Sequence, residues 1–499
     1  MKKSLVALLV LFVMVANIFA LTGCDLQGIW DSLLKDESQA PTGKIVENYE
    51  IPATGFNLDE AVTIKFYHTM GQNLKDVLDK YIPKFNELYP NITIEHEQVG
   101  GYDDVRNQIK TEINVGNQPN MAYCYPDHVA LYNVSETVVN LNSLISSTME
   151  ITRADGTTEI LGLTQDQIND FIPAYYQEGR QFGHKDPTGV DVMYTMPLSK
   201  STEVLYYNKT FFDAHNLKVP TTWDELEAVM AQIKAIDPTC IPLGYDSEGN
   251  WFITMTEQLG TPYTSATEVN GTHFLFDDER NYEFVKRFNS WYNAGYVTTQ
   301  ELLGAYTSSL FVEQDPAKPN SYMSIGSSAG ATHQRPAKGA DGKYPFEVGI
   351  APIPQANVAN PKVISQGPSL CIFQGKKISD QQIIASWLFT KYLITTVAFQ
   401  AEFSMASGYI PVIQSVTTNE VYAEFLNKAN GGDNVAALSV KQGLAQKDYY
   451  YVSPAFNGSS TARDQVGIIL QKGLVLTSNV DAELKKIFQS AINECENTQ

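Results

Sequence analysis

The chain has 499 residues, a length typical of two or three domains, and its 43% hydrophobic content is sufficient for a large core. Its 35 basic and 56 acidic residues give a net charge of −21. This balance argues against nucleic-acid binding, which requires clustered Lys and Arg, and against lying flat on anionic lipid.

The first predicted element is an export signal. Two lysines at positions 2 and 3 precede an apolar run over residues 5–21, which ends in the tetrapeptide LTGC at 21–24. This order is typical of a secretory signal peptide. A transmembrane helix is disfavoured, because 17 residues is the short limit for a span and no basic cluster follows. The tetrapeptide resembles the bacterial lipobox, so we expect residues 1–23 to be removed and Cys24 to be acylated.

Residues 24–57 are predicted to form a lipidated, mostly flexible tether. They carry Pro, Gly, Ser and charge without sustained periodicity. Two or more acyl chains give stable anchoring. The predicted location is therefore the outer face of the cell membrane, with the protein exported and held through Cys24. Loss of residues 1–23 leaves 33 basic and 56 acidic residues, a net charge of −23 that favours solubility.

The remaining cysteines, at 124, 240, 371 and 495, are more than a hundred residues apart and form no CxxC pair. Zinc-finger and thioredoxin-like sites are therefore disfavoured. We expect buried free thiols rather than a disulfide framework. The seven His show no HExxH or comparable spacing, so we expect neither a metal nor a cofactor.

From Val62 onward, strand and helix patterns alternate. Strand patterns cover 62–70 (VTIKFYHTM), 92–99 (ITIEHEQV) and 120–126 (NMAYCYP), and residues 73–90 and 103–116 carry apolar residues at helical spacing. Such alternation indicates βαβ units and a parallel sheet covered on both faces.

A capping box marks the start of a central helix. Pro220 stops the preceding segment, and Thr222 is followed three residues later by Glu225. This pattern predicts an amphipathic helix that begins at Trp223.

The segment at 196–234, MPLSKSTEVLYYNKTFFDAHNLKVPTTWDELEAVMAQIK, resembles the signature of family 1 extracellular solute-binding proteins, the receptors of sugar-type ABC importers. Further segments follow the family's order over about residues 58–475, among them EINVGNQPNMAYCYPD, FEVGIAPIPQ, QGPSLCIFQGK and AEFSMASGYIPV. In the first of these, Asn120 stands where the family prefers Asp.

The resemblance implies an α/β, two-lobed periplasmic-binding-protein fold. Two hinge-linked lobes, each with a central β-sheet flanked by helices, would close over a ligand. By the resemblance, lobe one covers 58–200 plus 321–366, and lobe two covers 204–320 plus 367–490. The implied function is that of a substrate-binding lipoprotein that captures a carbohydrate and delivers it to ABC permease subunits. We expect a monomer and no enzyme activity.

The candidate ligand-binding residues are taken from strand ends, because open α/β sheets bind ligands beyond the carboxyl ends of their strands. They are Tyr67, His68, Thr69, Gln72, Tyr125, Asp127, Glu203, Trp251, Ser327, Ser328, Gly367, Tyr409 and Arg463. Carboxylates and amides suit sugar hydroxyls, and Trp251 and Tyr409 are the candidates for stacking on a pyranose ring. The competing interpretation is that such residues pack in the core, cap helices or face solvent. Trp223, Trp291 and Trp387 are assigned to packing, since each lies in a helical pattern.

One motif favours an enzyme. Residues 326–330 (GSSAG) match GxSxG, the nucleophile elbow of α/β-hydrolases. That fold places its His well after the Ser, but the only His that follows Ser328 is His333, five residues on. A Ser hydrolase is therefore disfavoured. A glycoside hydrolase would need a carboxylate pair at a defined separation, which the sequence leaves open.

Within the family, the segment order is closest to the glycerol-3-phosphate-binding branch. That branch carries an Arg in a Leu-Arg-Leu-Gly run, where this chain has Ala455 or Phe456, with Arg463 several residues later. A phosphodianion needs Arg or stacked backbone amides. We therefore expect a neutral mono- or oligosaccharide first, and glycerol-3-phosphate or a related phosphodiester second. A non-transport surface sensor or adhesin is the alternative from a different class.

Overall fold

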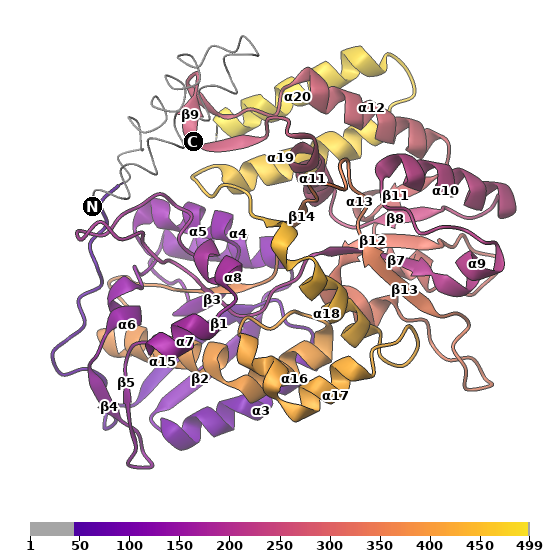
Figure 1. The fold of residues 1–499 in the computed structure, drawn as a ribbon. Coiled ribbons are helices and arrows are strands. Elements are labelled where there is room, and N and C mark those ends of the chain that lie inside the picture. Colours follow the sequence, from indigo (N-terminus) through magenta and orange to yellow (C-terminus); the bar gives the residue numbers. More distant parts are fainter. Residues whose placement is uncertain (1–43, 498–499) are drawn as a thin grey trace, which may run out of the picture.

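The computed structural model describes residues 44–497 (Figure 1). The predicted signal peptide, Cys24 and the first part of the predicted tether lie outside these residues. Two α/β lobes, each built on a five-stranded sheet, lie side by side and are joined by a hinge. The predicted two-lobed α/β fold is confirmed.

The sheet of lobe one has the strand order β2-β1-β3-β15-β6. Its strands are β1 (Val62–His68), β2 (Ile92–Gln98), β3 (Met121–Cys124), β6 (Met196–Pro197) and β15 (Ser369–Ile372). The first three are parallel, as the alternating pattern predicts, and β15 pairs antiparallel with both β3 and β6. The parallel strands therefore end at one edge of the sheet.

Helices cover both faces of this sheet. Ile64 and Phe66 of β1 face one apolar core. Tyr67 of β1 and Ala122 of β3 face a second core, which is formed with α4 and α5. The elements of lobe one outside its sheet are α3 (Gln72–Leu88), α4 (Tyr102–Ile113), α5 (Pro126–Tyr132), η1 (Asn133–Ser135), α6 (Asn142–Ser146), β4 (Glu150–Thr152), β5 (Thr158–Ile160), α7 (Gln165–Asp170), α8 (Pro173–Glu178), α15 (Asp380–Thr395), α16 (Val397–Ser407), η3 (Gln414–Thr418) and α17 (Glu420–Asn427).

The sheet of lobe two has the order β11-β8-β12-β7-β13. Its strands are β7 (Glu203–Asn208), β8 (Leu243–Tyr245), β11 (Val297–Thr299), β12 (Met323–Ser327) and β13 (Val348–Pro352). Strands β8, β11 and β12 are parallel, and β7 and β13 complete the sheet through antiparallel pairs. This lobe also presents three carboxyl strand ends at one edge.

The remaining elements belong to lobe two or lie beside the hinge. They are α9 (Lys209–Ala214), α10 (Trp223–Ile236), α11 (Glu248–Leu259), β9 (Thr264–Val269), β10 (Thr272–Phe274), α12 (Glu279–Asn293), α13 (Gln300–Leu303), α14 (Ser308–Phe311), η2 (Ser328–Gln334), β14 (Val363–Ile364), α18 (Val435–Ala445), η4 (Lys447–Tyr449), β16 (Tyr450–Tyr451), α19 (Ser459–Leu474) and α20 (Val480–Glu496). Helix α10 begins with the predicted capping box, in which Thr222 Oγ1 accepts from the Glu225 N–H at 3.2 Å. The three tryptophans assigned to packing are all buried.

The division of the chain between the lobes differs from the prediction. Strands β12 and β13, within 321–366, belong to the sheet of lobe two, whereas β15, within 367–490, belongs to the sheet of lobe one. The predicted assignment is therefore wrong for 321–366 and for the first part of 367–490, from β15 to α17, whereas α19 belongs to lobe two as predicted. The reason is that β12 inserts between β8 and β7, so the chain stays in lobe two until it crosses back after β14.

Two crossing segments form the centre of the hinge. Ser201 and Gln366 exchange backbone hydrogen bonds of 2.7 and 2.9 Å, which tie the outgoing segment to the returning one. Gly367 has a φ of +103°, and a Cβ at this position would lie 2.8 Å from the Lys200 Cα. Only glycine allows this close approach without strain.

The second part of the predicted tether, residues 44–57, is fixed against lobe one, and we call it the strap. The Val46 N–H donates to the carbonyl of Lys185 at 2.8 Å, and the Tyr49 hydroxyl donates to Asp380 at 2.8 Å. The prediction of a flexible tether is therefore wrong for the strap, because its backbone and aromatic groups find partners on the folded lobe.

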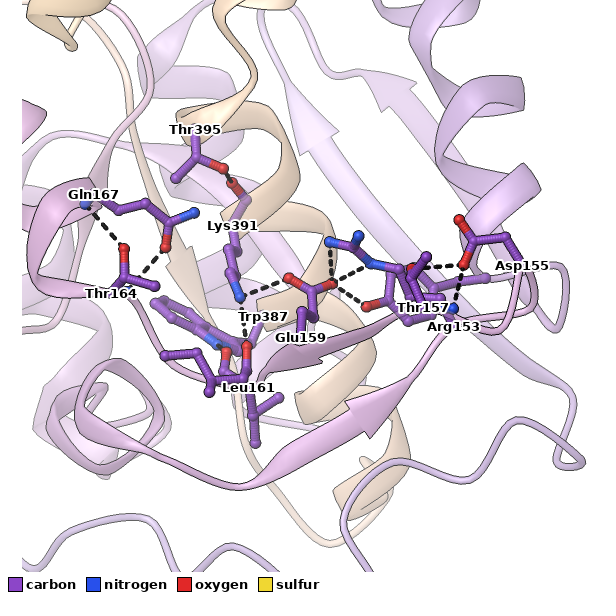
Figure 2. A network of polar contacts seen from close by, with 12 residues as sticks. Arg153, Asp155, Thr157, Glu159, Leu161, Thr164, Gln167, Trp387, Lys391 and Thr395 are labelled. Atoms are coloured by element: carbon purple, nitrogen blue, oxygen red, sulfur yellow. Dashed lines mark hydrogen bonds and ion pairs between the residues drawn. The ribbon is translucent and has the colours of Figure 1, made fainter.

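A polar network fastens the β4–β5 hairpin to α15 (Figure 2). Glu159 accepts hydrogen bonds from Arg153 at 2.8 Å and from Lys391 at 2.7 Å, and it also pairs with Tyr89. Lys391 is 6% exposed, and it donates as well to the carbonyl of Ile160 at 2.6 Å. Because Lys391 is almost completely removed from water, Glu159 is its necessary counter-charge.

We expect Glu159→Gln to lower the free energy of unfolding at pH 7 by about 1.5–3 kcal/mol, the range for hydrogen bonds to charged groups. Burial alone would raise the pKa of Glu159, but hydrogen bonds from Arg153 and Lys391 outweigh burial and lower it below its ordinary 4.5. A lowered carboxyl pKa stabilises the fold above 4.5, and this contribution is lost as the pH falls through the folded-state value. The difference in the free energy of unfolding between the variant and the parent protein should therefore become smaller in acid. Urea titrations at pH 7 and at pH 3 measure it, and an equal difference at both values would contradict this account.

Three of the predicted thiols, Cys124, Cys240 and Cys371, are buried and free, and Cys495 is buried as well. Within residues 44–497, no single helix is long and apolar enough to cross a bilayer. Helices α15 and α16 taken together are long and apolar enough to cross a bilayer, and the chain bends by 70° between them.

Candidate functional site

A cavity of about 1020 Å³ lies between the two lobes. Its walls come from the loops that follow the carboxyl ends of the parallel strands, as the rule for open α/β sheets requires. Lobe one contributes residues after β1, β2 and β3, and lobe two contributes residues after β8, β11 and β12, together with one side of α19.

Tyrosines form the lobe-one wall of this cavity. The rings of Tyr102 and Tyr125 stack at 4.3 Å between centroids, with 20° between their planes. Tyr409 lies close to both. Burial is the main cause that raises the pKa of Tyr102 well above its usual value, and the neighbouring Tyr409 hydroxyl adds to this rise. Flat aromatic faces of this kind suit the C–H face of a sugar ring or a cation.

The cavity is strongly acidic. Eight carboxylates line it, against one guanidinium, that of Arg463. The eight are Asp103, Asp127, Glu178, Glu203, Asp246, Glu248, Glu301 and Asp464.

Four of these carboxylates have a cation beside them. Asp103 and Asp464 lie 3.2 and 3.1 Å from Arg106. Glu178 lies 2.7 Å from Lys200, and both side chains are at most 2% exposed. The fourth ion pair, between Asp127 and Arg463, is described next.

Asp127 and Arg463 pair at 3.3 Å across the cleft, from α5 of lobe one to α19 of lobe two. Arg463 also donates to the Asn250 Oδ1 at 2.6 Å. Burial alone would raise the pKa of Asp127, but His128 and Arg463 together lower it. Among residues 44–497, the one Arg or Lys that lines the cavity is therefore already neutralised by the protein.

The other four carboxylates, all from lobe two, have no cation within 4 Å among the residues that the structure describes. Glu203 Oε2 accepts from the Tyr245 hydroxyl at 2.9 Å, and its Oε1 is buried without a hydrogen-bond partner. Asp246 accepts the backbone N–H of Thr307 at 2.8 Å. Burial raises the pKa of Glu203 to about 8 and that of Asp246 to about 6.

The remaining two uncompensated carboxylates lie next to Asp246. Glu248 Oε1 accepts from the backbone N–H of Glu301 at 3.1 Å, and burial raises the pKa of Glu248. No group of three or more His, Cys, Asp or Glu within residues 44–497 is arranged to hold a metal ion.

Seven of the predicted site residues line the cavity: Thr69, Tyr125, Asp127, Glu203, Ser327, Tyr409 and Arg463. They come from six separate stretches of the chain, which the fold of the two lobes brings together. Whether each of them touches a ligand stays a prediction.

Two of the predicted residues on β1 face away from the cavity. Tyr67 lies in the second core of lobe one, where its hydroxyl donates to Glu112 at 3.1 Å. His68 is fully buried, with its Nε2 2.9 Å from the Nδ1 of His96. Strand alternation sends both side chains into the lobe, so neither is placed as predicted.

Gln72, Ser328 and Gly367 do not line the cavity either. Gln72 is exposed and donates to Asp76. Ser328 is fully buried, and its Oγ accepts from the Thr202 N–H at 3.2 Å. The GxSxG sequence therefore lacks the exposed serine that a nucleophile elbow presents.

Trp251 is a core residue rather than a wall of the cavity. It is 0% exposed and lies between the rings of Tyr245, at 4.6 Å, and Phe288, at 4.1 Å. The predicted stacking of Trp251 on a ligand is wrong, because α11 turns this side chain into lobe two.

The sequence analysis missed Tyr102, Asp246, Glu248, Asn250 and Tyr306. Three of them follow β8 directly, and Tyr102 follows β2 after two glycines. The strand-end rule that selected Tyr125 could have found these four. Tyr306 lies in a loop between two short helices and carries no such signal.

The sequence profile described as bacterial extracellular solute-binding protein matches residues 80–429. The sn-glycerol-3-phosphate-binding periplasmic protein UgpB of Salmonella typhimurium is 23% identical over 362 residues, which are 70% of this chain and 74% of that protein. UgpB of Escherichia coli K12 is 23% identical over 390 residues, covering 76% and 80%.

Solved structures show the same fold. UgpB from Mycobacterium tuberculosis, in complex with glycerophosphocholine, superposes with a TM-score of 0.67 at 15% identity and covers 87% of this chain and 98% of its own. Maltose-bound MalE3 of T. maritima gives a TM-score of 0.65 at 15% identity, covering 86% and 99%.

Proposed function

The chain belongs to the bacterial extracellular solute-binding protein family, and from this premise we propose that it captures a carbohydrate between its lobes as the receptor of an ABC importer. The cavity between the lobes carries this proposal. Its volume of about 1020 Å³ is at the upper end of the range of small-molecule sites. Closure of the lobes would then bury the solute and mark the loaded form for the permease.

The cavity walls have the two kinds of group that sugars need. Carboxylates and amides such as Glu203, Asn250 and Gln366 accept or donate hydrogen bonds to hydroxyls, and Tyr125 and Tyr409 offer flat apolar faces. These groups come from both lobes, so a bound sugar would bridge them.

A phosphodianion fits this cavity less well, although the UgpB relatives are named for sn-glycerol-3-phosphate. The carboxylates that have no cation beside them disfavour a dianion, and Arg463 is held by Asp127 and Asn250. Binding of phosphate would require Arg463 to leave a buried carboxylate behind, which is costly. A carbohydrate without phosphate therefore remains the first choice.

The family is extracellular, so the protein is exported. We propose further that Cys24 carries the lipid anchor and that its tether is limited to residues 24–43, because the strap is fixed on lobe one. Anchoring would keep the receptor at high effective concentration near its permease. Membrane fractionation of cells that carry Cys24→Ala is the direct test.

A thermal-shift screen against mono- and oligosaccharides, glycerol-3-phosphate and glycerophosphocholine tests the function. A ligand at a hundredfold excess over Kd should stabilise the protein by about 2.7 kcal/mol. Tyr409→Ala should remove most of that shift, whereas Tyr449→Ala, on a tyrosine 40% exposed outside the cavity, should retain it. No shift from any carbohydrate, together with a shift from a peptide, would overturn the proposal.

A further inference from the structure

The carboxylates of the cavity fall into two groups that differ in charge compensation. Each acidic residue that lobe one or α19 contributes has an Arg or Lys within 4 Å. Glu203, Asp246, Glu248 and Glu301 have none among the residues that the structure describes. The protein therefore pairs the acidic residues on one side of its cavity with cations and leaves those on the other side without a counter-charge.

The uncompensated group lies beside an aromatic ring. The loop after α13 carries Tyr306 and Thr307, and the Thr307 N–H donates to the Asp246 carboxylate at 2.8 Å. Tyr306 lines the cavity although it is 66% exposed. Tyr409 of lobe one lines the same cavity, so each lobe offers an aromatic ring to the solute.

From this arrangement we infer that the solute carries a positively charged amino group, held between Asp246 and Glu248 and the rings of Tyr306 and Tyr409. This inference rests on the proposed function and names the class of its solute as an amino sugar. A protonated amine donates hydrogen bonds to the carboxylates, and tyrosine faces attract it through their quadrupole.

The physical reason is the cost of burying charge. When the lobes close over a neutral sugar, Asp246 and Glu248 must lose water without gaining a counter-charge, which is unfavourable. An ammonium group on the solute offsets that loss. The pKa of each carboxyl is raised by burial, which shows that water already solvates them poorly.

A metal ion is a weaker occupant of this place. Cations such as Ca²⁺ need six to eight converging oxygens. No three acidic, His or Cys side chains within residues 44–497 converge in that way. A single ammonium group requires fewer ligands and suits carboxylates that are spread along one wall.

Matched sugars that differ in one substituent test the inference. Calorimetric titration would compare the affinity for glucosamine with that for glucose and for N-acetylglucosamine. The same three forms would be compared in the galactose and mannose series. The β-1,4-linked glucosamine disaccharide would be compared with cellobiose. The pH should keep the amines protonated. In the series that binds most tightly, we expect the amino sugar to bind at least about tenfold more tightly than its hydroxyl and acetamide counterparts.

Each result is decisive. If the neutral member binds as tightly as the amino sugar, this inference fails while the proposed function stands. If no carbohydrate of any kind binds, both fail. A preference for glycerol-3-phosphate over every sugar would also overturn both.

The double variant Asp246→Asn/Glu248→Gln locates the amine site. These changes mimic the protonated carboxyls and keep the size of each side chain, so the fold should be retained. We expect the preference for the amine to fall to about twofold or less. Glu283→Gln, on an exposed side chain of α12 in the same lobe, should keep the full preference. If the double variant also keeps it, the assignment to Asp246 and Glu248 is wrong.

Discussion

Trp251→Ala is expected to lower the free energy of unfolding by about 3–5 kcal/mol, the usual cost of truncating a buried aromatic side chain. Trp251 is 0% exposed and lies between Tyr245 and Phe288 in the core of lobe two. Its removal would leave a cavity that the sheet on one side and α12 on the other cannot easily fill. A urea titration followed by circular dichroism measures the loss.

The control is Trp251→Phe, which keeps an aromatic ring between the same two neighbours and should cost less than the alanine variant. If Trp251→Ala unfolds like the parent protein but no longer binds sugar, then Trp251 contacts the ligand and lies in the binding site after all.

Arg463→Ala is expected to loosen the contact between the lobes and to weaken solute binding. Arg463 and Asp464 are adjacent on α19, and they pair with Asp127 and Arg106 of lobe one at 3.3 and 3.1 Å. Each lobe thus contributes one acidic and one basic residue, and these four residues form two ion pairs between the lobes. Asp127 is 8% exposed, so removal of its partner leaves a buried charge, at a cost of about 3–5 kcal/mol.

This cost applies to the equilibrium between lobes in contact and lobes apart. It is close to the roughly 5.5 kcal/mol that moves a two-state equilibrium from 1:99 to 99:1. We therefore expect a larger radius of gyration in small-angle scattering and a Kd for the solute raised by about a hundredfold or more. The cost arises because Asp127 can ionise only beside a cation when the lobes are in contact.

Asp127→Asn in the Arg463→Ala background should restore part of the loss, since no charge is then left unpaired; together with the two single variants it forms a cycle that isolates the coupling. Lys428→Gln, which removes an exposed pair within α17 and the turn after it, should change neither quantity measurably. Unchanged scattering and affinity in Arg463→Ala would show that these ion pairs do not hold the lobes together.

The alternation of strand and helix patterns was sufficient to predict βαβ units and a parallel sheet, because it reports local structure, whereas the two-lobed arrangement was implied by the family resemblance. It could not show which sheet each late strand joins. The place of β12 between β8 and β7 depends on contacts with residues more than 75 positions away. Such partners are chosen by three-dimensional packing, so residues 321–366 were assigned to the wrong lobe.

At the site, the strand-end rule succeeded for residues that directly follow a strand, and it failed for residues within β1 and for Trp251, further along α11. Tyr125 and Asp127 follow β3 and line the cavity. After β8, the lining residues are Asp246 to Asn250, and Trp251 is the next residue along α11. Along an α-helix, the direction of the side chain turns by about 100° from one residue to the next, so Trp251 points into the core.

The strap gives the two lobes different mechanical roles. Since residues 44–57 are fastened to lobe one alone, any attachment at Cys24 would reach the receptor through that lobe. Lobe one would then be the stationary body near the membrane. Opening and closing would then swing lobe two, and with it the negative wall of the cavity, toward and away from a fixed aromatic wall.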